Sequence, residues 1–118
     1  MLWVILAIVL IVIAFLIYMF PLVQVCGDSM LPTYNDGDIL IGCRLFSIDT
    51  SAVYVFRPPV GENYVIKRLA FVSPKSGKLF FMGDNLNFSY DSRMYGYVSR
   101  DKVVAKCIFT IHKGKECS

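Results

Sequence analysis

Histidine is nearly absent from this sequence, so the chemistry it usually supplies must come from other residues. His112 is the only histidine among 118 residues, and it lies far along the chain from every candidate serine nucleophile. A Ser-His-Asp triad is therefore not expected. The four cysteines include no Cys-x-x-Cys pair, which argues against a structural zinc site. We expect neither a metal nor a cofactor.

Charge is missing from the start of the chain. Residues 1–20 contain no charged residue, no glycine, no proline and no amide side chain. As a helix rising about 1.5 Å per residue they would span roughly 30 Å, the thickness of a bilayer's hydrocarbon core. Trp3 and Tyr18 lie near its two ends, where their rings favour the headgroup region, and Pro21 marks its expected end. The sequence predicts a transmembrane anchor over 1–20 and a single domain over 21–118.

Two other interpretations of the apolar segment compete with a retained anchor. A cleavable signal peptide has a shorter apolar region and a basic start, whereas this run begins at Met1 without one. A buried core helix would need the fewer than 100 residues that follow to cover all its sides. A retained anchor is favoured over both.

The charges after the apolar segment indicate its orientation. The first are acidic, at Asp28, Asp36 and Asp38, and the first basic residue is Arg44. Cytoplasmic flanks normally carry an excess of Lys and Arg, which this flank lacks. We therefore expect a cytoplasmic N-terminus and an exported C-terminal domain.

An exported domain would place its cysteines in an oxidising space. One or two disulfides can form there, and four cysteines allow three full pairings. Their spacing does not choose among these pairings. The four are Cys26, Cys43, Cys107 and Cys117.

Positive charge is concentrated in the second part of the chain, because eleven of the twelve Lys and Arg residues follow position 50. This part can rest on anionic lipid headgroups, or its charges can be scattered over a solvated surface, which is the favoured reading. No nucleic-acid-binding motif accompanies the charge, so nucleic acid is not expected as a partner. The oligomeric state is not indicated.

After Pro21 the sequence changes to short β-like runs separated by turn residues. An Asp-Gly turn at 35–38 precedes one run, and a second run at 51–56 ends close to two prolines. The run at 63–72 is separated from the run KLFFM by a predicted hairpin loop. A final run covers 102–111. We expect a compact, mainly β domain, a sheet or barrel-like fold of antiparallel strands, directly after the membrane helix.

Lys67 is the lysine best placed to act as a base. Val65, Leu69 and Phe71 would share its face of the strand, and an apolar pocket lowers the pKa of an amine. The opposite face is apolar too, so alternation does not tell whether Lys67 or Arg68 points inward. Arginine cannot act as a base, which selects Lys67 only if one of the two is catalytic. The alternative is a Lys-Arg pair on an exposed strand edge.

Two polar segments offer further candidates. Ser29 lies within GDSMLPT, where Gly27 would let a substrate backbone approach and leave amides free for an oxyanion. The same segment can be an ordinary turn. The segment at 83–93 reads as a polar loop, or as a site braced by a charged pair of Asp91 and Arg93.

Together and in this order, these segments resemble bacterial signal peptidase I, the Ser/Lys membrane proteases that remove signal peptides from exported proteins. GDSMLPTYNDGDILI is similar to the family's nucleophile box, with Ser29 as the attacking serine, and YVIKRLA to its lysine box, with Lys67 as the base. GDNLNFSYDSRMYGYV is similar to the C-terminal box, where Ser89 would orient the lysine and Asp91 and Arg93 would form a structural charge pair. AVYVFRPP is similar to the strand box between them.

The resemblance implies a fold and a reaction. The fold would be a transmembrane helix followed by a signal-peptidase-type β domain on the outer face of the bacterial cytoplasmic membrane. Exported preproteins would be cut after an Ala-x-Ala-like site, with the peptide bound as an added strand. Met30 would help to line the pocket for the small residues, and the Ser29 amide would hold the oxyanion. Gly27 stands where some members carry a helping serine, so that second donor is not expected here.

The sequence also departs from the family pattern. Ser51-Ala52 replace the usual Gly-Asp before the strand box, and LAFVSPKSGK replaces a Gly-x-Pro-Gly-Asp run. The insertion of larger members is missing. A dedicated maturation peptidase for a prepilin-like or conjugation substrate therefore stays as an alternative. A non-enzymatic, membrane-tethered β module that docks a partner is the alternative from another class.

Overall fold

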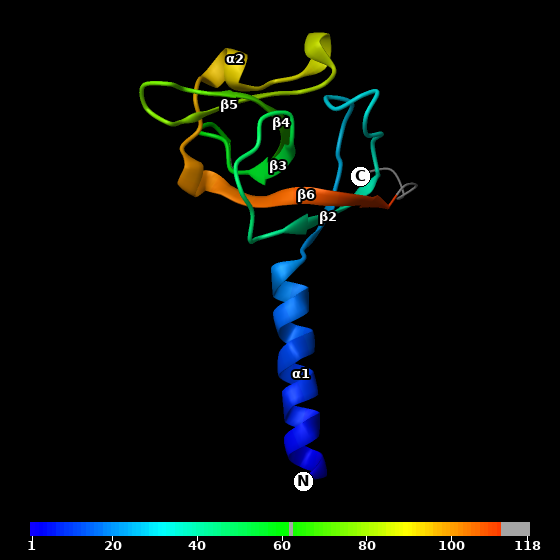
Figure 1. Cartoon of the computed structure of the whole chain (residues 1–118). Helices are drawn as coiled ribbons and strands as arrows, with labels where there is room; N and C mark the ends of the chain where they lie inside the picture. Colours follow the sequence, from blue (N-terminus) through cyan, green and yellow to red (C-terminus); the bar gives the residue numbers. More distant parts are fainter. Residues whose placement is uncertain (62, 112–118) are drawn as a thin grey trace.

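The N-terminal apolar segment folds as one long helix that stands apart from the rest of the chain. The computed structural model describes residues 1–61 and 63–111, so His112 and Cys117 lie outside the described residues. Helix α1 covers Leu2–Met19, has a mean hydropathy of 3.1 and buries none of its residues against the protein. Figure 1 shows it projecting from the β domain. By length and composition it can cross a membrane, as predicted.

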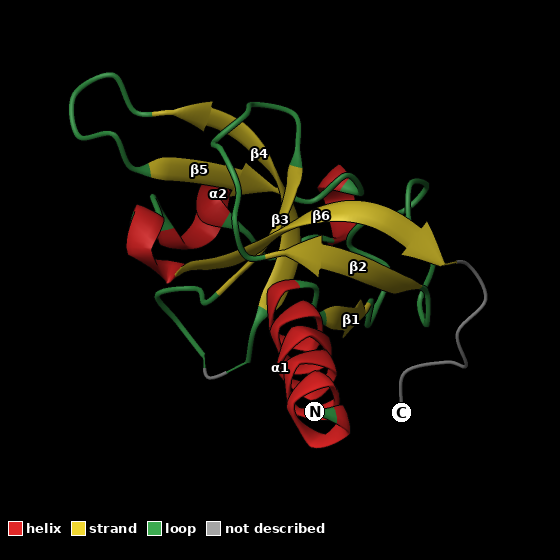
Figure 2. Cartoon of the chain, turned by 60° about the horizontal axis from the view of Figure 1, so that its bottom comes forward, coloured by secondary structure: helices red, strands yellow, loops and turns green. Residues whose placement is uncertain are grey.

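The remainder is built on one antiparallel sheet of six strands in the order β1-β2-β6-β3-β4-β5. Each pairing is antiparallel, and Figure 2 shows β2 and β6 side by side, pointing in opposite directions, near one end of α1. The predicted mainly β, antiparallel domain is confirmed. The strands are β1 (Leu22–Gln24), β2 (Ile39–Cys43), β3 (Val53–Phe56), β4 (Val65–Val72), β5 (Leu79–Met82) and β6 (Val103–Ile111).

Short helical turns connect the later strands. Two follow β5: the 3-10 turn η1 (Leu86–Phe88) and the one-turn helix α2 (Ser92–Tyr95). A third, η2 (Arg100–Lys102), leads into β6, so the final strand begins one residue later than predicted. In Figure 1, η1 and α2 lie at the far end of the molecule from α1.

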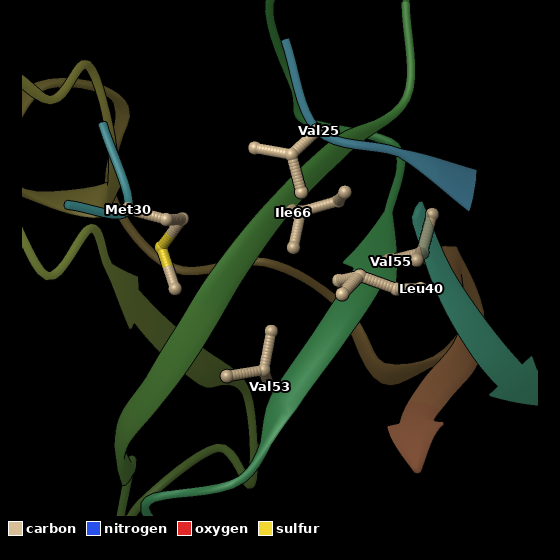
Figure 3. Packing of buried hydrophobic residues seen from close by; sticks show 6 residues of the cluster. All are labelled: Val25, Met30, Leu40, Val53, Val55 and Ile66. Atoms are coloured by element: carbon tan, nitrogen blue, oxygen red, sulfur yellow. The ribbon is translucent and has the colours of Figure 1, made fainter. Parts of the chain in front are cut away.

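The central strand β3 packs on both faces, which explains why its sequence is apolar throughout. Val53 and Val55 belong to one cluster, and Tyr54 and Phe56 belong to the other. The first cluster is closed by Val25, Met30, Leu40 and Ile66, as Figure 3 shows. Because alternate residues of a strand point to opposite faces, the two clusters lie on opposite sides of the sheet. Each face of the sheet therefore has its own core.

Two cysteines of adjacent strands stay unpaired with each other. Cys43 and Cys107 are free thiols. Cys43 is registered with Lys106, while Cys107 is registered with Gly42, so their side chains project to opposite faces of the sheet. Burial raises the pKa of the Cys107 thiol to about 12, which makes it unreactive. A disulfide between these two cysteines, one of the pairings that the sequence left open, is not formed.

Candidate active site

A cleft lies between β1 and the start of β4. Its volume is ≈ 130 Å³. One wall comes from β1 and the residues after it, and the other from the start of β4. The lining residues are Val23, Gln24, Val25, Cys26, Ser29, Met30, Tyr64, Val65, Ile66 and Lys67. Two segments of the chain therefore line opposite sides of the cleft, and Ser29 and Lys67 are among the lining residues.

Ser29 and Lys67 meet in this cleft, although 38 positions separate them in sequence. A hydrogen bond of 2.6 Å joins Lys67 Nζ and Ser29 Oγ. The lysine is only 6% exposed. Burial lowers its pKa, while the negative charge of Asp91 acts in the opposite direction and raises it. A buried amine within hydrogen-bond reach of a hydroxyl can accept its proton.

The strand places Lys67 on the face that the sequence analysis considered. Lys67 is registered with Tyr54, and both Val65 and Leu69 pack with the cluster that contains Tyr54. The predicted contribution of Phe71 is wrong. The register of β4 against β5 shifts between Leu69 and Phe71, and Phe71 instead stacks on Phe80 with 43% of its surface exposed. The irregularity breaks the alternation on which the expectation rested.

The segment that carries Ser29 is held by the chain that follows β5. Asn85 donates from its backbone amide to the Ser29 carbonyl at 2.8 Å and from Nδ2 to the Asp28 carbonyl at 3.0 Å. On the other side, Asp36 accepts from the Gly27 amide at 2.7 Å. Gly27 has φ +88°, a backbone conformation that favours glycine. The turn that carries Ser29 is therefore anchored at both ends.

At Gly83 the backbone after β5 approaches Ser29 and Ser89 closely, and the sequence analysis did not single out this glycine. A Cβ there would lie 2.1 Å from Ser89 Oγ and 2.6 Å from the Ser29 carbonyl oxygen. Ser89 Oγ is buried and forms no hydrogen bond of ordinary geometry with the described residues. It still lies near enough to Asp91 to help keep that carboxyl charged. In the sequence, the Gly-Asp dipeptide at the start of the polar segment was the feature that could have pointed to this close contact.

Asp91 and Arg93 form a salt bridge. Arg93 Nε lies 2.9 Å from Asp91 Oδ1, and Asp91 is fully buried. Burial tends to raise the pKa of Asp91, but hydrogen bonds from the Arg93 side chain and the Gly83 amide outweigh it and lower the pKa to about 2. Asp91 also caps α2 through the Arg93 amide. The pair links the turn after β5 to the start of α2.

Arg68 has a structural role that the sequence did not reveal. It binds Asp84 with two hydrogen bonds of 2.8 Å, from Nε and from one terminal nitrogen. Asp84 also accepts from the Thr33 hydroxyl in the turn that follows Ser29. This bidentate pair connects β4, the segment after β5 and the turn that carries Ser29. Arg68 is thus neither at an exposed edge nor beside Ser29.

Met30 is fully buried in the first core cluster and also lines the cleft. Among the described residues, no group of three His, Cys, Asp or Glu side chains is arranged to hold a metal ion. Gln24, Cys26 and Tyr64 also line the described part of the cleft, where the Ser29 hydroxyl and the Lys67 amine form a hydrogen-bonded pair. Such a pair can perform acyl transfer, with the serine as nucleophile and the amine as base.

Comparisons with known proteins identify the family of this chain. The model of the family described as signal peptidase, peptidase S26, matches residues 1–73 and 70–112. A probable signal peptidase I-1 of Synechocystis sp. is 26% identical over 92 residues, covering 75% of this chain and 47% of the relative. The chain therefore spans about half the length of that relative. Mitochondrial inner membrane protease subunit 1 of Schizosaccharomyces pombe is 32% identical over 114 residues, covering 77% of this chain and 73% of the relative.

The family match extends from the apolar helix through the final strand and includes both residues that meet in the cleft. With a relative above 30% identity that aligns over most of both chains, this protein belongs to the signal peptidase family, peptidase S26.

Proposed function

We propose that this protein is a membrane-bound serine endopeptidase that removes N-terminal signal peptides from exported preproteins, with Ser29 as nucleophile and Lys67 as general base. The observation that carries the proposal is the 2.6 Å contact between Ser29 Oγ and the amine of Lys67, a residue that is only 6% exposed. Family membership supports the reaction class.

The reaction proceeds in two acyl transfers. Neutral Lys67 takes the hydroxyl proton as Ser29 Oγ bonds to the scissile carbonyl carbon, and the tetrahedral intermediate collapses as the protonated lysine gives that proton to the leaving amine. This yields an ester on Ser29 and the free mature protein. Lys67 then takes a proton from water, whose oxygen attacks the ester, and returns the proton to Ser29 as the signal peptide leaves.

The oxyanion would be held by the backbone amide of Ser29. Within the described part of the chain this amide donates no hydrogen bond, whereas the neighbouring Gly27 amide is engaged by Asp36. A donor that is already oriented stabilises developing charge without reorganisation. Gly27 supplies no side-chain donor, so this single amide would carry the task.

The substrate would lie as an extended strand between β1 and β4. Residues 23–26 form one wall of the cleft and residues 64–67 form the other. Such a peptide gains main-chain hydrogen bonds, and its alternate side chains enter the pocket beside Met30. The small volume of this cleft, ≈ 130 Å³, supports small residues at the first and third positions before the cut.

We place residues 1–20 across the bacterial cytoplasmic membrane as the anchor and residues 21–118 on its outer face as the catalytic domain. The support is an apolar helix without buried residues, followed by a flank whose first charges are acidic. The lipid bilayer and exported preproteins, prepilin-like ones among them, would then be its partners.

Cleavage of a preprotein with an Ala-x-Ala site tests the proposal. The detergent-solubilised protein is incubated with the preprotein and the cut is mapped by mass spectrometry. Ser29→Ala and Lys67→Ala should each reduce kcat by at least about 10³-fold while the thermal transition remains cooperative. The matched controls are Thr50→Val and Lys75→Ala, which alter an exposed hydroxyl and an exposed amine away from the cleft. Unchanged cleavage by either active-site variant would refute the assignment.

A further inference from the structure

The end of α1 is joined to the sheet by more than the connecting chain. Arg44, directly after β2, donates from its backbone amide to the Met19 carbonyl at 2.9 Å and from Nε to the Tyr18 carbonyl at 2.8 Å. Its guanidinium carbon lies 4.6 Å from the centre of the Tyr18 ring. Next to it, the Gly42 amide donates to the Pro21 carbonyl at 2.8 Å.

These contacts give the helix a C-terminal cap made by a distant segment. The last carbonyls of a helix have no partner within it and carry partial negative charge. A guanidinium satisfies one such carbonyl, stacks on an aromatic ring and brings a positive charge to the negative end of the helix dipole. The cap connects α1 to β2, the strand that lies close to the helix end in Figures 1 and 2. We term the contacts of Arg44 with Tyr18 and Met19 the helix joint.

The helix joint lies where α1 would leave the bilayer, because every residue of α1 is apolar or aromatic and none is buried in the protein. The catalytic cleft is close to it along the chain. Gln24, which lines the cleft, is five residues beyond Met19, so roughly 18 Å of extended chain is the most that separates them. A fixed joint therefore fixes the height and tilt of the cleft relative to the membrane surface.

We propose that Arg44 is a positioning residue that sets how far above the bilayer a substrate is cut. The proposal rests on the proposed function, because a signal peptide would present its cut site at a defined distance from its own membrane-embedded apolar segment. With a rigid joint, only one spacing brings the scissile bond to Ser29. With a loose joint, the cleft samples several heights and the spacing requirement weakens.

Cleavage in vesicles tests this role with two substrates. The full chain, Arg44→Gln and the control Arg57→Gln are reconstituted in vesicles; Arg57 is exposed, and within the described residues its side chain makes no hydrogen bond. For a preprotein inserted in the same vesicles, Arg44→Gln should lower kcat/KM about tenfold and should broaden the range of accepted spacings in a series of spacer lengths. For a soluble peptide with the same cut site, kcat/KM should be unchanged. Equal loss on both substrates, or an unaltered spacing profile, would overturn the proposal.

A measurement that does not depend on activity separates this inference from the proposed function. Energy transfer from a fluorophore at position 76, in the exposed loop between β4 and β5, to a dye in the bilayer reports the height of the domain. The native chain and Arg57→Gln should give one narrow distribution, and Arg44→Gln a broader one. Identical distributions in all three proteins would rule out the joint even if the enzyme cleaves preproteins. Failure of every protein to cleave, with a broader distribution in Arg44→Gln, would instead remove the proposed function and leave the joint standing.

Discussion

Lys67 is subject to two opposing influences. Burial lowers its pKa by penalising the ammonium form, and the nearby negative charge of Asp91 raises it. The net direction is downward from the ordinary value of 10.5. A base with a lowered pKa is neutral, and therefore active, in a larger fraction of molecules near pH 7. The residues that cover this amine consequently matter as much as the amine itself.

Activity should rise with pH through a midpoint well below 10.5, because only the neutral amine can accept the Ser29 proton. Stability should change in the same direction. Between the folded and the unfolded pKa, unfolded Lys67 binds more protons than folded Lys67, so the free energy of unfolding increases with pH in that window. The pH profile of kcat/KM measures the change in activity, and chemical denaturation over the same pH range measures the change in the free energy of unfolding. A midpoint near 10.5 would contradict the buried-base argument.

Asp91→Asn should separate the effect of Asp91 on stability from its effect on the pKa of Lys67. Loss of the carboxylate leaves Arg93 without its partner and should lower the free energy of unfolding by about 2 kcal/mol at pH 7. The neutral side chain also removes the charge that raises the pKa of Lys67, so the acid limb of the rate profile should move to lower pH. An acid limb that stays in place or moves upward would show that Asp91 does not act on the lysine.

Asp91 also makes the free energy of unfolding depend on pH, but in the acid range. Its folded pKa of about 2 lies below the ordinary 3.8, so its contribution is complete above pH 4 and is lost as the pH falls toward 2. In Asp91→Asn this acid-dependent loss should be absent. Denaturation curves of both proteins between pH 2 and pH 5 provide the comparison.

The polar segment after β5 supports the turn that carries Ser29. It approaches that turn so closely that Gly83 has no room for a side chain, and Asn85 donates two hydrogen bonds to it. The position of Ser29 relative to Lys67 therefore depends on three segments distant in sequence. They are joined by Asp84, which binds both Arg68 and Thr33.

Gly83→Ala should reduce kcat about 10²-fold, because the new methyl group would displace the Ser29 carbonyl and with it the hydroxyl. Overpacking should also cost about 1–3 kcal/mol of stability. The control is Gly77→Ala, where a Cβ meets nothing within 4 Å and only the positive φ is unfavourable. That variant should lose about 1 kcal/mol without loss of activity. Comparable activity of the two variants would argue against the support role.

Local sequence patterns predicted where the strands lie, but not which side chain of β4 points to the cleft. The hairpin of β4 and β5 and the strand after the Asp-Gly turn are at their predicted places because turn residues bound strongly β-forming runs. The orientation of Lys67 against Arg68 could not be read in this way. The first part of β4 is apolar on both faces because Ile66 packs in one core cluster and Leu69 in the other, and the irregularity at Leu69 and Phe71 has no signature in the sequence.

The molecule consists of an exposed apolar helix and a β domain with its own two cores. No residue of α1 is buried, so the domain should not need the helix to fold. Removal of residues 1–20 takes away the contacts of the helix joint and should therefore lower the free energy of unfolding by no more than about 2 kcal/mol, while unfolding stays cooperative. The truncated protein should cleave a soluble peptide and be extracted from vesicles by alkaline carbonate, whereas the full chain should resist extraction. A truncated protein that fails to unfold cooperatively would contradict the division at residue 20.

Composition, local periodicity and turn residues were enough to predict the apolar helix, the β character of the rest and the residue types available for chemistry. The family resemblance added the expectation that Ser29 and Lys67 act together. The folded chain was needed to show that Ser29 Oγ and Lys67 Nζ lie 2.6 Å apart, that Arg68 binds Asp84, and that Arg44 connects the helix to the sheet. Such contacts join positions tens of residues apart, and their geometry arises from packing of the whole sheet, which no local pattern encodes.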